Sequence, residues 1–460
     1  MVVTRFAPSP TGYLHIGGLR TALFSWLWAR KNNGKFLLRI EDTDLARNSE
    51  EAKDAILEAF DWVGLNYDGE AVFQSKRFDL YKEYVQKLLD EGKAYYCYMT
   101  KEELDALREE QKINGQRQGY DGRYRDGKLP PREGVAPSVR IKAPLEGEIT
   151  FEDGVKGIIT TKAVDLDDFV IARSDGTPTY NFCVAIDDAL MGITEVIRGD
   201  DHTSNTPRQI VVYNALGFNV PKFYHVPMIL GTDGKKLSKR DGAADVMDYK
   251  KLGYQPEALL NFLVRLGWSH GDKELFSMDE MLALFDPKNI NSSASQYNLD
   301  KLNWISGEHI KATPFEKIAK LLEGFDCDLS KTQNAKLAVK AISERAKTLI
   351  ELADGINAML NEPTEYDEKA VEKNINEAAK KILSSFDAVL VNSNCVNAEE
   401  FKNIIDEFLS VSSLKMPQLG LPLRIALVGN TQSPSLNELL AVVGAKKASE
   451  RIKIFLSKLG

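Results

Sequence analysis

The sequence contains few cysteine residues, and they are scattered along the chain. Only four occur among 460 residues, with no regular spacing that would indicate a disulfide framework. This pattern is typical of proteins that fold in a reducing compartment. The four residues are Cys97, Cys183, Cys327 and Cys395.

Long apolar runs and an excess of positive charge are also missing. No run of about 18 apolar residues occurs, so no transmembrane helix is predicted. The first residues, MVVTRFAPSP, lack the basic and then apolar pattern of a signal peptide. The formal net charge is −8, so any surface that binds nucleic acid must be local. These absences predict a cytoplasmic protein without membrane attachment.

The length and the residue pattern predict several domains. A chain of 460 residues is long for one core, and its 43% hydrophobic content is ordinary for a globular protein. Strand and helix patterns alternate at 1–93 and again at 178–230. Residues 94–177 are rich in Gly, Arg and Asp and carry short strand patterns, which indicates an inserted α+β module. A further segment covers 231–306, and 307–460 is a succession of amphipathic helices.

Several segments carry a local helix or strand pattern. The segments 250–266, 335–352 and 368–383 each carry the pattern of one continuous helix. The apolar stretch 180–186 is predicted to be a strand, and 285–306 is predicted to be a connecting segment.

The stretch RFAPSPTGYLHIGG, residues 5–18, has the pattern of a nucleotide site. A β-branched and apolar run precedes it, and apolar residues at helical spacing follow it at 19–33. A strand that enters a Gly- and Pro-rich turn and then a helix presents backbone N–H groups to phosphate. The stretch matches neither the Walker loop nor GxGxxG. His15 is expected to point to where the phosphates would lie.

Two other stretches carry charge at the ends of predicted strands. The strand 36–40 ends at Glu41, where a side chain can face a substrate beyond the sheet. The later loop GTDGKKLSKRDGA contains Lys235, Lys236, Lys239 and Arg240 among glycines. Such a loop can stabilise the negative charge of a polyphosphate, although a basic run alone is usually a solvated surface.

Together, HIGG and KLSKR resemble the HIGH and KMSKS motifs of the class I aminoacyl-tRNA synthetases. Further sequence motifs resemble those of the bacterial glutamyl-tRNA synthetase family. They are TRFAPSPTG, RIEDTD, SDGTPTYNF, VIRGDDH and HVPMI. The resemblance covers almost the whole chain. It implies an α/β Rossmann-type catalytic domain with an α+β insertion, followed by an all-α C-terminal anticodon-binding region. In this family the insertion binds the acceptor stem, and 231–306 holds the KLSKR loop and stem contacts.

The resemblance also implies an activity. ATP, with Mg²⁺ as its substrate complex, would activate L-glutamate to glutamyl-adenylate. The acyl group would then pass to the 2′-hydroxyl of the 3′-terminal adenosine of tRNA(Glu). The reaction demands alignment and charge stabilisation more than a protein nucleophile.

Site residues follow from the positions that match the family. The catalytic residues would be His15, Lys236 and Lys239. ATP would contact Pro8, Ser9, Gly17, Gly18, Leu237, Ser238 and Lys239. Glutamate would contact Arg5, Ala7, Ser9, Glu41, Tyr180, Arg198 and His202. Arg345 would contact tRNA.

The chain departs from the family pattern at two places. The fourth position of HIGH is Gly18, so no histidine side chain acts there. Some bacterial relatives bind zinc in the insertion through a C-x-C pair and a C-x-H pair. At these positions the chain has Cys97, Met99, Tyr124 and Asp126, and tetrahedral structural zinc needs four good ligands. We therefore expect no structural zinc and no protein-bound metal site.

Three alternatives remain open from the residues. The same chemistry could act on tRNA(Gln) and supply an amidotransferase. The second alternative is a nucleotidyltransferase of another family that uses an HxGH motif, but such an enzyme would lack the helical C-terminal region. A tRNA-binding paralogue without activity would have lost His15 or Lys239, and both are present. We also expect the protein to be a monomer.

Overall fold

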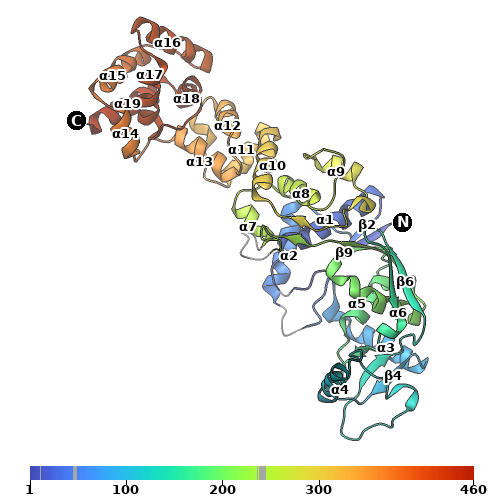
Figure 1. The fold of residues 1–460 in the computed structure, drawn as a ribbon. Coiled ribbons are helices and arrows are strands. Elements are labelled where there is room, and N and C mark those ends of the chain that lie inside the picture. The colour runs from blue at the N-terminus through green and yellow to red at the C-terminus, as the bar shows by residue number, and fades with distance from the viewer. Residues whose placement is uncertain (11, 45–48, 236, 238–244, 460) are drawn as a thin grey trace. The chain divides into compact units, whose positions relative to one another are not determined.

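The computed structural model describes residues 1–459 apart from residues 11, 45–48, 236 and 238–244 (Figure 1). The chain divides into two compact units. The first unit combines Met1–Asp248 with Leu260–Asn298, and the second combines Tyr249–Leu259 with Leu299–Gly460. A large cluster of buried apolar side chains lies in each unit.

A parallel three-stranded sheet begins the first unit. Its strands are β1 (Val3–Phe6), β2 (Lys35–Ile40) and β3 (Val72–Phe73), in the order β1-β2-β3. The helices α1 (Ile16–Lys31), α2 (Glu50–Val63) and α3 (Phe78–Asp90) alternate with these strands along the chain. All four residues of β1 are buried, as expected for a parallel strand covered on both faces. The strand and the helix predicted on either side of the glycine-rich turn are therefore confirmed.

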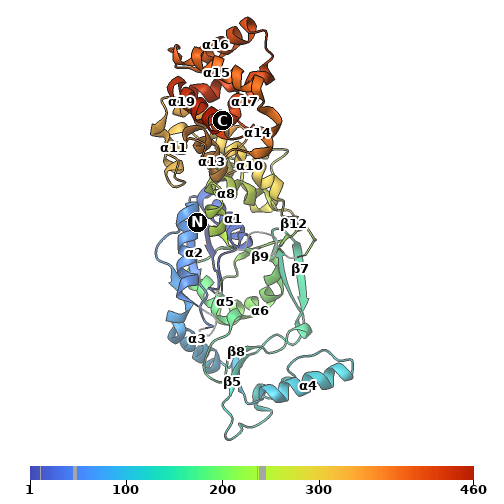
Figure 2. The same cartoon turned by 90° about the vertical axis from the view of Figure 1, so that its left-hand side faces the viewer.

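A second parallel pair, β9 (Glu195–Gly199) and β10 (Lys222–Val226), continues the α/β pattern. The Val3 amide donates to the Thr194 hydroxyl at 2.9 Å, and the Thr194 amide donates to the Val3 carbonyl at 3.0 Å. These bonds place the start of β9 beside the start of β1. The helices α5 (Tyr180–Leu190) and α6 (Thr206–Leu216) pack side by side in the same unit (Figure 2).

The prediction of a strand at 180–186 is wrong, because these residues form α5. A short apolar run fits a buried helix as well as a buried strand, and periodicity alone does not separate the two. Near the C-terminal end of the helix lie two buried aspartates, Asp187 and Asp188, which are ion-paired with Arg77 and Arg39 respectively. Partners distant in the sequence thus hold the helix in place.

The residues 94–177 form two separate β-structures. Antiparallel strands β4 (Ala94–Cys97), β5 (Ser138–Ile141) and β8 (Val170–Ala172) make one sheet, and α4 (Lys101–Ile113) follows β4. The hairpin of β6 (Glu148–Asp153) and β7 (Gly157–Lys162) joins a different sheet, in the order β7-β6-β10-β9. This part of the insertion therefore shares a sheet with strands of the α/β fold. The domain boundaries given above stay predictions.

Two predictions for the segment 246–312 are wrong. The predicted helix 250–266 is two helices, α7 (Val246–Lys251) and α8 (Pro256–Arg265). Gly253 has a φ of 81°, which a helix does not allow, and Pro256 is the first residue of α8. The predicted helix is therefore interrupted between α7 and α8. The predicted connection 285–306 contains β12 (Ser295–Gln296), which pairs with β11 (Ile229–Leu230), and the start of α10 (Leu299–Ala312). The helix α9 (Met278–Leu284) precedes it.

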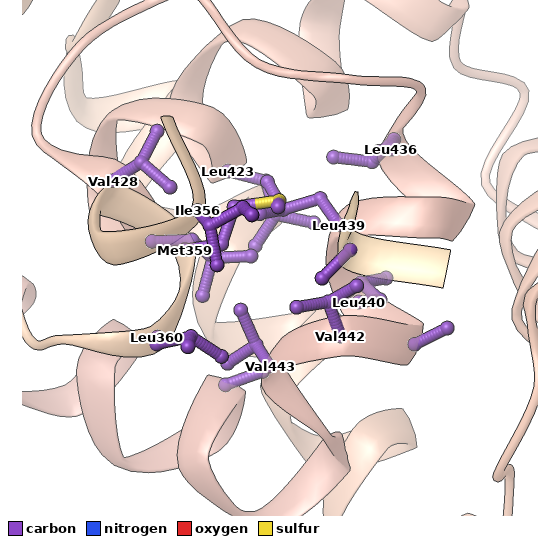
Figure 3. Close-up of a cluster of buried hydrophobic side chains, with 14 of the residues drawn as sticks. Ile356, Met359, Leu360, Leu423, Val428, Leu436, Leu439, Leu440, Val442 and Val443 are labelled. Atoms are coloured by element: carbon purple, nitrogen blue, oxygen red, sulfur yellow. The ribbon is translucent and has the colours of Figure 1, made fainter. Parts of the chain in front are cut away.

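The described residues from 299 onward are helical or irregular, and buried aliphatic side chains from several helices meet in their core (Figure 3). The predicted helices 335–352 and 368–383 are each two helices, because Thr348 and Asn376 cap new N-termini. None of the helices in the described chain is long and apolar enough to cross a membrane. The helices are α11 (Phe315–Glu323), α12 (Ala335–Ser343), α13 (Leu349–Leu360), α14 (Glu368–Asn374), α15 (Glu377–Val391), α16 (Ala398–Val411), α17 (Met416–Val428), α18 (Leu436–Val443) and α19 (Ala445–Lys458).

Candidate functional site

The carboxyl ends of β1 and β2 lie together, and they bring the first predicted site residues to one place. Ala7, Pro8 and Ser9 follow β1, and Glu41 follows β2. The Glu41 amide donates to the Pro8 carbonyl at 2.9 Å, which joins the two loops. Ligands in open α/β sheets bind at this edge. Ser9 is exposed there, whereas Glu41 is buried.

Arg5 on β1 and Arg39 on β2 share a buried carboxylate, Asp188. Arg5 Nε donates to Asp188 at 3.1 Å, and Arg39 Nη1 donates to it at 2.6 Å. Arg39 Nη2 also donates to Glu41 at 3.0 Å. Burial raises the pKa of Asp188, but the guanidinium groups of Arg39 and Arg5 outweigh it and hold this pKa below the usual range. The predicted glutamate-binding arginine Arg5 is therefore held by a carboxylate of the protein itself.

A second buried aspartate, Asp187, completes this network on the side of α3. Its carboxylate accepts from Gln74 Nε2 at 2.8 Å, from Arg77 Nε at 2.9 Å and from the Tyr81 hydroxyl at 2.7 Å. Burial, reinforced by Asp187, raises the pKa of the Tyr81 hydroxyl, so it stays protonated and donates. Asp187 thus attaches α5 to α3 and to the residues just before α3.

Arg198 on β9 is buried and has no carboxylate among its hydrogen-bond partners in the described chain. Its Nε donates to His225 Nε2 at 3.1 Å, and its Nη2 donates to the Thr206 hydroxyl at 2.8 Å. Its Nη1 is buried without a hydrogen-bond partner among the described residues. Burial lowers the pKa of Arg198. A buried cation of this kind is costly unless an anion pairs with it.

Tyr180 and His202 form another wall of the same site. The Tyr180 hydroxyl lies 3.1 Å from His202 Nδ1. Burial and then the nearby Glu41 carboxylate raise the pKa of Tyr180. Burial and then the Arg198 guanidinium lower the pKa of His202 to about 4, so the imidazole is neutral near pH 7. The site therefore keeps its positive charge on arginines.

His15 caps the N-terminus of α1. Its Nδ1 accepts a hydrogen bond from the Gly18 amide at 3.1 Å, and the imidazole is exposed. A Cβ atom at Gly17 would lie 3.1 Å from His15 Nδ1, and one at Gly18 would lie 3.0 Å from Leu14 Cδ1. The two glycines thus leave room for the imidazole to fold back over the helix terminus, next to N–H groups that favour anions.

Part of the predicted phosphate loop lies outside the described residues, namely Lys236, Ser238 and Lys239. Leu237 is described, and its amide donates to the Ile229 carbonyl on β11 at 3.1 Å. Gln296 Nε2 donates to the Gly231 and Thr232 carbonyls at 3.3 and 3.0 Å. The base of the loop is therefore tied to β11 and β12.

The sequence interpretation missed the carboxylates and the histidine that hold the arginines. These residues are Asp153, Asp187, Asp188 and His225, together with Arg39. One signal was available for Arg39, because a charged residue in the apolar strand KFLLRI must find a buried partner. The partner itself comes from α5, far along the chain, and no local pattern reveals it.

The positions that hold zinc in some relatives have other partners. Cys97 is fully buried and clusters with Tyr120 and Tyr124, while Asp126 pairs with Lys142 at 2.7 Å. In the described parts of the chain, no group of three or more His, Cys, Asp or Glu side chains is placed to hold a metal ion. Absence of zinc stays a prediction, which metal analysis of the purified protein would test.

Arg345, the predicted tRNA contact, is exposed in the second unit. Its Nη1 donates to the Ser433 carbonyl at 3.2 Å, and Arg424 Nε donates to the Ser433 hydroxyl at 2.9 Å. Burial and then repulsion from Arg345 lower the pKa of Arg424. Two arginines thus converge on one loop, an arrangement that suits an anionic ligand.

Comparison with known families and proteins agrees with this geometry. The family model "tRNA synthetases class I (E and Q), catalytic domain" matches residues 1–304, and "Anticodon binding domain" matches residues 311–456. A glutamate–tRNA ligase 2 of Nitratiruptor sp. is 63% identical over 460 residues, and the match covers 100% of both chains. A glutamate–tRNA ligase 1 of Sulfurovum sp. is 60% identical, again over 100% of both chains.

A solved structure shows the same architecture. The glutamate tRNA ligase of Elizabethkingia meningosepticum, crystallised with its amino acid, superposes with a TM-score of 0.89. It is 31% identical, and the match covers 100% of each chain.

The α/β fold, the residues at its strand ends and the helical C-terminal unit define a class I tRNA synthetase of the glutamate and glutamine type. Within this class, the chain belongs to the glutamate–tRNA ligase family. The predicted family and fold class are confirmed.

Proposed function

We propose that the protein attaches L-glutamate to tRNA(Glu) in two steps, at the expense of ATP. One observation carries the choice of glutamate. Near the strand ends, three guanidinium groups are ion-paired with carboxylates. The buried Arg198 instead has no carboxylate among its hydrogen-bond partners in the described chain, and its Nη1 has no partner there. An amino acid with an anionic side chain neutralises the charge of Arg198, whereas glutamine does not. The three ion-paired guanidinium groups belong to Arg5, Arg39 and Arg77, and their carboxylates belong to Asp188, Glu41 and Asp187.

In the first step, the glutamate α-carboxylate attacks the α-phosphorus of ATP, and pyrophosphate leaves. His15, Lys236 and Lys239 stabilise the charge that develops on the phosphates. Pro8, Ser9, Gly17, Gly18, Leu237 and Ser238 contact ATP, which enters as its Mg²⁺ complex. Arg5, Ala7, Ser9, Glu41, Tyr180, Arg198 and His202 hold the glutamate.

In the second step, the 2′-hydroxyl of the terminal adenosine attacks the glutamyl carbonyl, and AMP leaves. The residues 94–177 bind the acceptor end, and the helical region 307–460 binds the anticodon. The closeness of Arg345 and Arg424 supports the latter assignment, because two repelling cations are stabilised by an RNA anion or an acceptor on a base.

Replacing Arg198 with methionine should raise the KM for glutamate by about tenfold to a hundredfold. This increase corresponds to the binding free energy lost with one or two hydrogen bonds to a charged group. The KM for ATP should stay unchanged. Steady-state kinetics with each substrate varied in turn measures both values. Arg30→Met, which alters an arginine paired with Asp68 away from the site, is the matched control. A wild-type glutamate KM in the Arg198 variant would remove this residue from the pocket.

Replacing Arg345 with alanine should raise the KM for tRNA by about tenfold and leave glutamate activation unchanged at saturating tRNA. The exposed Lys453 on α19, replaced with alanine, controls for a general loss of surface charge in the same unit. Equal effects of the two substitutions would show that Arg345 has no specific contact with tRNA.

The proposal is tested by charging purified tRNA(Glu) and tRNA(Gln) separately with labelled glutamate. Charging of tRNA(Glu) is expected, and charging of tRNA(Gln) alone would contradict it. The names of the relatives do not favour the tRNA(Gln) alternative. We also propose that the enzyme is a cytoplasmic monomer. Light scattering after size-exclusion chromatography would test the oligomeric state.

A further inference from the structure

A buried chain of three side chains links the insertion to the proposed glutamate pocket. Asp153 ends β6, His225 lies on β10, and Arg198 lies on β9. Asp153 Oδ2 lies 2.6 Å from His225 Nδ1, and His225 Nε2 lies 3.1 Å from Arg198 Nε. The exposed fractions are 2% for Asp153, 0% for His225 and 6% for Arg198. Water therefore does not compete for these contacts.

The donors in this chain determine the tautomer of His225. A guanidinium Nε–H can only donate, so His225 Nε2 must carry the lone pair that accepts it. The imidazole proton then lies on Nδ1 and is donated to Asp153. Burial lowers the pKa of His225, in keeping with a neutral ring. The Thr206 hydroxyl, which accepts from Arg198 Nη2, also lies 3.2 Å from His225 Nε2 and can donate to the same lone pair. An Nε2–H in place of that lone pair would be directed at the Arg198 Nε–H.

The carboxylate that sets this tautomer is itself held in place. Asp153 Oδ1 accepts from the amides of Val155 and Lys156 at 3.0 and 2.8 Å, which leaves Oδ2 to the imidazole and the His225 amide. Gly154 follows directly, and its amide donates to the Phe223 carbonyl at 2.8 Å. A Cβ atom at Gly154 would lie 2.1 Å from the Tyr224 ring, so only glycine allows this approach.

We propose that Asp153 and His225 are positioning residues for glutamate, which act by fixing the orientation of Arg198. With Nε bound to His225 and Nη2 bound to Thr206, the guanidinium plane is set and Nη1 stays available for a substrate carboxylate. The inference rests on the proposed function. It also makes the β6–β7 hairpin, part of the insertion, a support of the amino-acid pocket.

Asp153→Asn tests the tautomer directly. The amide oxygen can keep the bonds to Val155 and Lys156, and its NH₂ group then faces His225 Nδ1. That donor forces the proton to Nε2, against the Arg198 Nε–H, as a similar change does to a catalytic triad histidine. We expect the KM for glutamate to rise about tenfold. The KM for ATP should not change.

Two substitutions of His225 separate its two contacts. Asparagine places its amide near the Nδ1 position, so His225→Asn keeps a group beside Asp153 but leaves Arg198 Nε unpaired. Glutamine reaches the Nε2 position, so His225→Gln can still accept from Arg198. We expect a rise of about tenfold in glutamate KM for His225→Asn and of less than about threefold for His225→Gln. A role in packing alone would not distinguish the two.

The measurements are glutamate and ATP kinetics with tRNA present, and ¹⁵N NMR of protein labelled at its five histidines. The wild-type His225 signal should be that of the Nδ1–H tautomer, and Asp153→Asn should convert it to Nε2–H. His309→Asn in the other unit and Asp68→Asn control for the two kinds of substitution.

Unchanged glutamate KM in both Asp153→Asn and His225→Asn would overturn the inference, as would a wild-type Nε2–H signal. If His225→Asn does not fold, Asp153→Asn and the NMR signal still decide. A wild-type enzyme without glutamate-dependent activity would instead refute the proposed function, because the inference concerns only how that activity depends on Arg198.

Discussion

Replacing His15 with asparagine is expected to lower the rate of glutamate activation by about 10²–10³-fold, with little change in stability. Asparagine is a good N-cap residue, so its side chain can still accept the Gly18 amide that His15 Nδ1 accepts at 3.1 Å. What is lost is the imidazole that we propose stabilises the charge developing on the phosphates. Single-turnover kinetics and thermal unfolding measure the two effects separately.

The control for His15 is Ser49, whose hydroxyl accepts the Ala52 amide at 3.1 Å and caps α2 in the same way. Ser49→Ala should cost about 1 kcal/mol of stability and leave the activation rate near that of the wild type. His15→Ala should show both losses. If His15→Asn retains the wild-type rate, His15 only caps a helix.

Replacing Arg39 with methionine is expected to destabilise the first unit by about 3–5 kcal/mol. Arg39 is fully buried, and Asp188, Glu41 and Asp187 lie 2.6, 3.0 and 3.9 Å from its nitrogen atoms. Methionine fills much of the volume but leaves these carboxylates without their shared cation. Denaturant unfolding measures the loss, and glutamate binding should weaken in parallel because Asp188 also holds Arg5.

The control for Arg39 is Lys82→Met, which removes an exposed ion pair with Asp79 on α3. No measurable change in stability is expected from it, because exposed ion pairs contribute little. A similar absence of effect in Arg39→Met would show that the buried network does not stabilise the fold.

The sequence predicted the elements that have local signals. The strand and helix around His15 and the strand before Glu41 follow from hydrophobic period and turn residues. Arg198 and His202 were assigned to the site because they belong to the motif VIRGDDH, and the structure brings them near Tyr180. The assigned roles of these residues stay predictions.

The other features of the fold and the site depend on contacts between residues distant in the sequence, so no local pattern predicts them. The stretch 180–186 forms a helix whose aspartates bind arginines distant in the sequence, and period alone could not show this. Polar caps at Thr348 and Asn376 divide helices that look continuous by their apolar spacing. The contact of Asp153 with His225 depends on the pairing of β6 with β10, which joins segments about 70 residues apart.

The central claim is that the buried Arg198, which has no carboxylate among its hydrogen-bond partners in the described chain, selects glutamate for activation. ATP–pyrophosphate exchange, measured with glutamate or glutamine and with or without tRNA(Glu), tests it most directly. Exchange is expected with glutamate in the presence of tRNA and not with glutamine. Exchange that is as fast with glutamine, or that fails with glutamate when tRNA is present, would contradict the claim.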